Sequence, residues 1–227
     1  VKSGSLDSVC HLTSNLTIIF SVSDKPTSLG AHTPDTVYKL VAHQARQQPE
    51  QPALTGLDGP PLTYQGLLAQ LNQTIAALNA WGIGRGDCVA LVLPNGPALA
   101  AAFLSIAAGA ICAPLNPNYR REEFDFYLKD LRARALIATA NSNSPAAIAA
   151  VAAGINVIEL EVSGSDEPAG TFSLRGPNGR YGSGAEPAPK DFAEPCDTAM
   201  VLHTSGTTSR PKIVPLSGAN VCASAHH

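Results

Sequence analysis

The sequence predicts an α/β fold in which a largely parallel sheet is flanked by helices. Between residues 88 and 160, short apolar runs typical of buried strands alternate with longer segments of helical character. Proline or serine stands where several of these helices should begin, and glycine stands where they should end. Strands that alternate with helices of this length imply right-handed crossovers, which place successive strands parallel in one sheet.

Two helices are expected before this alternation begins. Thr33 can cap the first, with Pro34 as its first residue, and Pro49 ends it. Its apolar face comprises Val37, Leu40, Val41 and Ala45. Thr63 can cap the second helix, which Gly82 closes. Its apolar face comprises Leu67, Leu71, Ile75 and Leu78. Both patterns have the spacing of an amphipathic helix that packs on a sheet.

Four strands and three helices then follow in alternation. The strands are expected at residues 88–94, 110–116, 135–140 and 155–160, and the helices at 96–109, 118–134 and 144–154. Ser144 can cap the last of these helices, with Pro145 at its first position and Gly154 as its stop. In the middle helix, Glu122 and Glu123 lie in the first turn, where the helix dipole favours negative charge.

The remaining segments differ in character. Residues 1–32 show no clear periodicity and are rich in serine and threonine, which predicts a poorly ordered extension. Residues 163–190 are rich in glycine, proline and serine and are expected to form a long loop. Residues 198–206 return to a strand pattern, residues 212–216 form another, and residues 220–227 belong to a helix.

Composition excludes several classes of protein. The 227 residues are 44% hydrophobic and 15% charged, with a net charge of −3, which indicates a folded domain without a basic face for nucleic acid. Five dispersed cysteines without a CxxC pair argue against a disulfide framework or a zinc site and favour the cytoplasm. Residues 97–115 carry no charge, but their alanine, glycine and proline content favours a buried helix and strand over a transmembrane segment.

Residues 203–216, "HTSGTTSRPKIVPL", have the chemistry of a phosphate-binding loop. Gly206 permits a tight turn that lets backbone amides approach an anion. Arg210 and Lys212 supply positive charge, and Pro211 stiffens the exit. Short hydroxyl donors are supplied by Thr204, Ser205, Thr207, Thr208 and Ser209. The alternative is a solvated serine- and threonine-rich hairpin loop, but the density of donors directly after a buried strand favours phosphate binding.

This loop is not a Walker loop. In that motif a glycine precedes the lysine, and a serine or threonine follows it to bind magnesium. Here Pro211 precedes Lys212 and Ile213 follows it. The loop is therefore expected to join two strands instead of opening a helix.

The same stretch resembles the phosphate loop of the adenylate-forming, AMP-binding superfamily, which includes acyl-CoA synthetases and peptide-synthetase adenylation domains. Further matching motifs are "GIGRGDCVALVLPN" at residues 82–95 and "GAICAPLNPNYRREE" at residues 109–123. The resemblance extends over residues 33–227, and the "HTSGTTSRPK" variant followed by "VPL" looks most similar to the oxalate–CoA ligase branch. Ser209 stands where the family usually has glycine.

The resemblance implies the amino-terminal part of the large AMP-binding domain and an activity. Such an enzyme would use ATP and Mg²⁺ to convert a carboxylic acid to an acyl-adenylate, and would then transfer the acyl group to coenzyme A. The ATP phosphates would be bound by Thr204, Ser205, Gly206, Thr207, Thr208, Ser209 and Lys212, with accessory roles for His203 and Arg210.

The family's later elements do not occur in these 227 residues. They comprise the acyl pocket, the adenine-binding strands, the magnesium-binding glutamate, the ribose-binding aspartate and the small carboxy-terminal domain with its catalytic lysine. The chain is therefore expected to be a truncated fragment that contains no catalytic residue or metal ligand and is inactive alone. The alternative is a non-catalytic fragment of the same fold that binds nucleotide or a partner.

Overall fold

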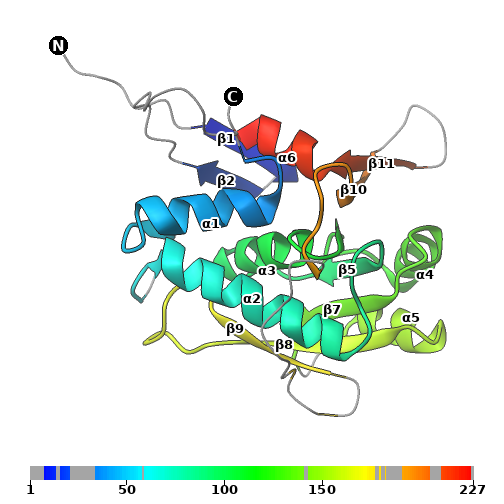
Figure 1. Ribbon diagram of the computed structural model, residues 1–227. Coiled ribbons are helices and arrows are strands. Elements are labelled where there is room, and N and C mark those ends of the chain that lie inside the picture. The colour runs from blue at the N-terminus through cyan, green and yellow to red at the C-terminus, as the bar shows by residue number, and fades with distance from the viewer. Residues whose placement is uncertain are drawn as a thin grey trace.

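The computed structural model describes residues 8–13, 16–20, 34–57, 59–140, 143–176, 179, 182, 191–204 and 211–225. Its centre is a seven-stranded sheet with the order β11-β10-β6-β5-β7-β8-β9 (Figure 1). The strands are β5 (Cys88–Val92), β6 (Ile111–Pro114), β7 (Ala135–Thr139), β8 (Asn156–Val162), β9 (Phe172–Arg175), β10 (Thr198–Thr204) and β11 (Lys212–Ser217). Strands from β10 to β8 are parallel, whereas the edge strands β11 and β9 are antiparallel to their neighbours. The predicted mostly parallel sheet is confirmed.

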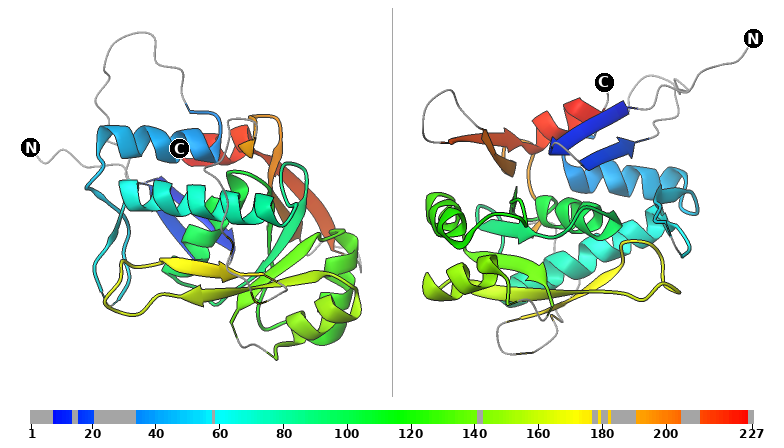
Figure 2. Two further views of the ribbon diagram at one scale, coloured as in Figure 1. Left: turned by 60° about the horizontal axis from the view of Figure 1, so that its bottom comes forward. Right: turned by 180° about the vertical axis from the view of Figure 1, so that it is seen from behind.

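Helices cover both faces of this sheet. The helices α1 (Val37–Gln47), α2 (Tyr64–Ala80) and α3 (Pro97–Ala107) contribute to one apolar cluster, and α4 (Arg121–Asp130) and α5 (Pro145–Ala152) to another. Figure 2 shows α1 and α2, in blue and cyan, on the other side of the molecule from α4 and α5. Because side chains alternate along a strand, Val89 and Leu91 of β5 join the first cluster, and Ala90 and Val92 join the second.

Smaller elements surround this core. The helix α6 (Gly218–Ala225) packs on α1 through Leu40, Cys222 and Ala225. Two-stranded sheets are formed by β1 (Ser8–Thr13) with β2 (Leu16–Phe20), and by β3 (Pro52–Leu54) with β4 (Leu62–Thr63). Among the described helices, none combines the length and the apolar character needed to cross a membrane.

Most predicted element boundaries agree with the structure. The Thr63 side chain accepts a hydrogen bond from the Gly66 amide at 3.1 Å, and the Ser144 side chain accepts one from the Ala147 amide at 3.2 Å. Gly82 follows α2 with a φ of +71°, as expected for a helix stop. These caps are local features, which is why the sequence alone could place them.

Three expectations differ from the structure. The cap of α1 is Thr36, whose Oγ1 accepts from the Lys39 amide at 3.2 Å; Thr33 lies outside the described residues, and Pro34 is not helical. The predicted loop at 163–190 contains β9, whose backbone is held by the distant Gln70 side chain at the Phe172 carbonyl, 3.1 Å away. Within residues 1–32, the β-branched run before Phe20 forms β2, which pairs with β1.

Candidate phosphate-binding site

The candidate site lies where β10 ends. Since β5, β6, β7 and β10 run parallel, their carboxyl ends meet at the same edge of the sheet. Ligands of open α/β sheets bind in crevices outside this edge. Thr204, the last residue of β10, therefore lies at the edge of the sheet where the fold accommodates ligands.

The two arms of the predicted loop lie opposite each other. The antiparallel register of β10 and β11 pairs Thr204 with Lys212 and His203 with Ile213. Thr204 and Lys212 are both exposed, and no ion pair between described residues includes Lys212. The structure thus joins two strands through this loop, as predicted, and brings a hydroxyl and a lysine together at its base.

The remaining predicted phosphate ligands lie outside the described residues. They are Ser205, Gly206, Thr207, Thr208, Ser209 and Arg210. Their assignment to phosphate remains a prediction, and the geometry of the site rests on its two described arms.

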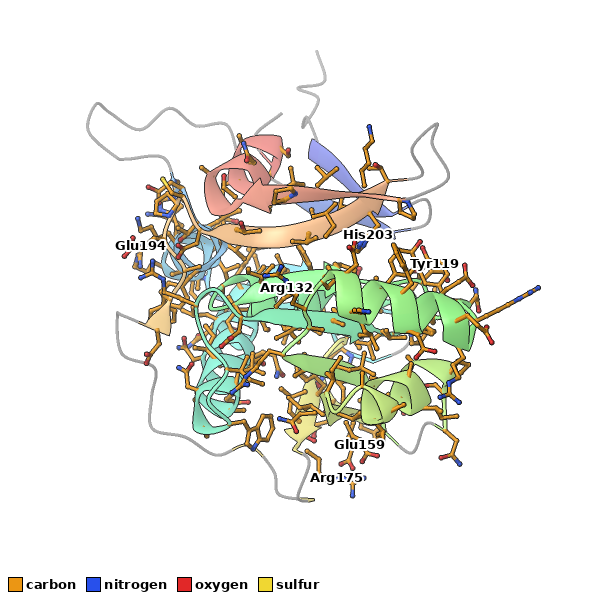
Figure 3. The ribbon with its side chains drawn as sticks, turned by 90° about the vertical axis from the view of Figure 1, so that its right-hand side faces the viewer. Tyr119, Arg132, Glu159, Arg175, Glu194 and His203 are labelled. Atoms are coloured by element: carbon orange, nitrogen blue, oxygen red, sulfur yellow. The ribbon has the colours of Figure 1, made fainter. Side chains whose placement is uncertain are left out.

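His203 makes a contact that the sequence did not reveal. Its side chain is only 5% exposed, and its Nε2 lies 3.1 Å from Oδ2 of Asp130, at the end of α4. Its ring meets that of Tyr127 edge to face, with centroids 4.6 Å apart. Figure 3 shows His203 in the space between β10 and α4. The signal available in the sequence was the acidic residue in the last turn of a helix, an unfavourable place for negative charge.

An aromatic cluster extends this contact toward the loop after β6. Tyr119 in that loop stacks on Tyr127, with ring centroids 4.9 Å apart, and meets Phe124 edge to face. Burial, with a hydrogen bond to Tyr127, raises the pKa of Tyr119 to about 12. Tyr119 therefore remains a neutral packing group at physiological pH.

The other reactive residue types offer little chemistry at this edge. Burial raises the pKa of Cys88 and of Cys222 to about 11, and that of Cys112 well above its ordinary value, so these thiols remain protonated. In the described part of the chain, no three histidine, cysteine, aspartate or glutamate residues gather as a metal site. We therefore assign no magnesium ligand to these residues.

Known proteins resemble this chain in sequence and in fold. A profile of the family described as "AMP-binding enzyme" matches residues 41–227. The protein named "Probable CoA ligase CCL9" from Humulus lupulus is 37% identical over 164 residues, which make up 72% of this chain and 30% of the relative. Oxalate–CoA ligase from Arabidopsis thaliana is 36% identical over 194 residues, covering 84% of this chain and 36% of the relative. The chain thus spans about a third of the length of these curated relatives.

A solved structure with the same fold is o-succinylbenzoate–coenzyme A synthetase from Bacillus subtilis, in complex with AMP. The two structures superpose with a TM-score of 0.58 over 78% of this chain and 41% of the other, at 20% identity. At that identity the likeness supports the fold alone.

Proposed function

Because the chain belongs to the AMP-binding enzyme family, we propose that its β10–β11 hairpin binds the phosphates of ATP in an acid–CoA ligase. Such an enzyme converts a carboxylic acid and ATP to an acyl-adenylate and pyrophosphate, and then transfers the acyl group to the thiol of coenzyme A. The complete activity is a proposal, because the chain spans about a third of the length of the curated relatives named above.

The pairing of Thr204 with Lys212 is the observation that carries this proposal. It places a hydroxyl donor and a lysine that makes no ion pair with any described residue at the two ends of a short loop, at the ligand-binding edge of the sheet. A polyphosphate between these arms would receive hydrogen bonds from Thr204 and an ion pair from Lys212. Charge-assisted hydrogen bonds of this kind are about twice as strong as neutral ones.

Lys212 would act mainly on the leaving pyrophosphate. When the acid attacks the α-phosphate, negative charge accumulates on the β- and γ-phosphates that depart. A fixed positive charge beside them stabilises this transition state more than the ground state, which is how electrostatic catalysis lowers a barrier. The hydroxyls and amides of residues 205–209 would contribute in the same sense. Magnesium would accompany ATP and neutralise part of its charge. We assign no ligand of this ion to the described residues.

Oxalate is the first acid to test, because the Arabidopsis thaliana relative named above is an oxalate–CoA ligase. The pocket that binds the acid determines which acid is used, and we do not assign that pocket to the described residues. A panel of small mono- and dicarboxylic acids, with ATP and coenzyme A, would identify the substrate of the complete protein.

The experiment that tests the proposal is the Lys212→Ala substitution in the complete protein. Loss of one charge-assisted phosphate contact should lower kcat/KM for ATP by about 10- to 150-fold, the equivalent of about 1.5–3 kcal/mol. Acid-dependent exchange of pyrophosphate into ATP measures this directly. Lys39→Ala removes another exposed lysine, on α1, and should leave the exchange rate unchanged. An exchange rate for Lys212→Ala equal to that of the unmodified protein would refute the role of the hairpin.

A further inference from the structure

We propose that Asp130 and His203 form a positioning pair that holds the first arm of the hairpin in the orientation required for nucleotide phosphate. The inference rests on the function proposed above and adds two residues to it, neither of which needs to touch the ligand. His203 directly precedes Thr204 on β10, so a change in the position of His203 would also redirect Thr204.

This arm, the end of β10, needs such support because its backbone has few ladder contacts on the side of β6. The parallel ladder between β10 and β6 joins a single register pair, Met200 with Cys112. Beyond Met200, the ladder contacts of β10 are with β11, which is itself the edge strand of the sheet. The last residues of β10 therefore depend on side-chain contacts for their position relative to the core.

His203 provides such a contact. Its nearly buried ring donates from Nε2 to the Asp130 carboxylate over 3.1 Å, and the Tyr127 ring closes one side of the imidazole at a centroid distance of 4.6 Å. A buried polar ring requires a hydrogen-bond partner, and this one finds it on another element, 73 residues away in the sequence. The contact ties the end of β10 to α4 (Figure 3).

Asp130 occupies a position that local preferences disfavour. It is the last residue of α4, where the helix dipole repels negative charge. The interaction with His203 offsets this repulsion, because it places an N–H donor against the carboxylate. Asp130 is unfavourable for the stability of α4 itself, so its contact with His203 of β10 accounts for its presence at this position.

The end of α4 is itself held firmly to the sheet. The Ala133 amide bonds to the Leu128 carbonyl at 3.1 Å, which closes the helix, and Arg132 between them adopts a φ of +50°. The Arg134 amide then bonds to the carbonyl of Cys88, at the start of the central strand β5, at 2.7 Å. Asp130 is therefore fixed relative to the core, and its contact with His203 fixes the end of β10 relative to the core as well.

The test compares Asp130→Ala and His203→Ala, singly and together, with Asp125→Ala in the complete protein. Asp125 is the matched control, since it is an exposed aspartate of the same helix that pairs with Arg121 at 3.8 Å. The steady-state KM values for ATP and for the acid are measured separately. Calorimetric titration with inorganic tripolyphosphate reports on phosphate binding without turnover.

Each single variant should raise the KM for ATP and weaken tripolyphosphate binding by about tenfold, and leave the KM for the acid unchanged. The double variant should be no worse than either single variant, because both remove the same contact. His203→Gln keeps a terminal N–H donor and should restore part of the loss. His203→Leu fills the buried space without a donor and replaces His203→Ala if that variant does not fold.

Different results would overturn different parts of the proposal. If Lys212→Ala weakens phosphate binding but Asp130→Ala and His203→Leu do not, the hairpin binds phosphate and the positioning pair is wrong. Additive losses in the double variant, or equal losses in Asp125→Ala, would also refute the pair. If none of these variants, including Lys212→Ala, changes phosphate binding, the proposed function itself fails.

Discussion

Gly170 illustrates how one residue constrains the loop between β8 and β9. It has a φ of +86°, and a Cβ at this position would lie 2.7 Å from the carbonyl oxygen of Pro97, the first residue of α3. Gly154, after α5, also has a positive φ of +70°, but a Cβ there would meet no atom within 4 Å. The two glycines share a left-handed backbone and differ in the space around them.

This difference gives a prediction at the scale of the residue. Gly154→Ala should lower the free energy of unfolding by about 1 kcal/mol, the cost of a left-handed alanine. Gly170→Ala should lower it by about 3 kcal/mol, because a backbone oxygen cannot move aside without displacing the start of α3. Urea denaturation of both variants measures the difference. Equal losses would show that the contact with Pro97 is not tight.

At the scale of the element, α4 ends in an unusual way. Its stop residue is Arg132, which adopts a φ of +50° where glycine is the common choice. A side chain in this conformation costs about 1–2 kcal/mol, and a β-branched side chain costs more. The helix therefore stores a small strain directly beside Asp130.

Substitutions at Arg132 should separate strain from charge. Arg132→Val should lower the free energy of unfolding by about 1–2 kcal/mol, because the branched Cβ tolerates the left-handed region poorly. Arg132→Gly removes the same charge and should leave stability within about 1 kcal/mol of the original. Thermal unfolding followed by circular dichroism would compare them. A loss in Arg132→Gly as large as that in Arg132→Val would assign the effect to the arginine side chain.

The elements that could be predicted from the sequence are those with local causes. A capping hydroxyl and a terminal glycine indicate helices α2 and α5, and an unbroken apolar run indicates β5. The sequence does not distinguish Thr33 from Thr36 as the cap of α1, because the two threonines lie three residues apart and a helix that begins at either one buries the same apolar face. The strand β9 has only four residues, and it pairs with β8 and is also held by Gln70, 102 residues away, so its short local pattern did not suffice to reveal it.

The same distinction applies to the site. A strand, a loop and a second strand are contiguous, so the sequence could predict that the loop joins two strands, whereas the register that pairs Thr204 with Lys212 comes from the structure. The approach of Asp130 to His203 depends on where α4 lies relative to β10, which is a property of the tertiary structure.

At the scale of the whole molecule, residues 191–197, which lead into β10, are held to the rest of the fold at several points. The Tyr38 ring of α1 stacks on Phe192 at a centroid distance of 3.8 Å, and the Ala193 amide bonds to the Ala108 carbonyl at 2.8 Å. Arg85, just before β5, donates two hydrogen bonds to the Asp197 carboxylate, from Nε to Oδ2 at 2.8 Å and from Nη2 to Oδ1 at 3.1 Å. These contacts connect the entry of β10 to the helices and to the central strand.

The Arg85 contact should make stability depend on acidity. Its hydrogen bonds, with that from the Glu194 amide, hold the pKa of Asp197 below its ordinary value of 3.8. A depressed carboxyl pKa contributes stability above the unfolded value, and this contribution is lost as the pH falls through the folded value. Arg85→Met should therefore lower Tm at pH 7, and this effect should shrink as the pH falls below 3.8. A difference in Tm that does not change with pH would contradict this assignment.

The short ladder between β10 and β6 has a consequence for the stability of the molecule to partial opening. With one register pair to β6 and six to β11, we expect the hairpin to open as a unit more readily than β5, which is paired along both sides. Backbone amides of β10 and β11 should therefore exchange with deuterium at a lower opening free energy than those of β5 and β7. Saturating ATP should slow exchange in the hairpin more than in β5, because a ligand that binds only the closed hairpin adds its binding energy to the cost of opening it. Equal protection of β10 and β5 in the free protein would mean that the sheet opens only as a whole.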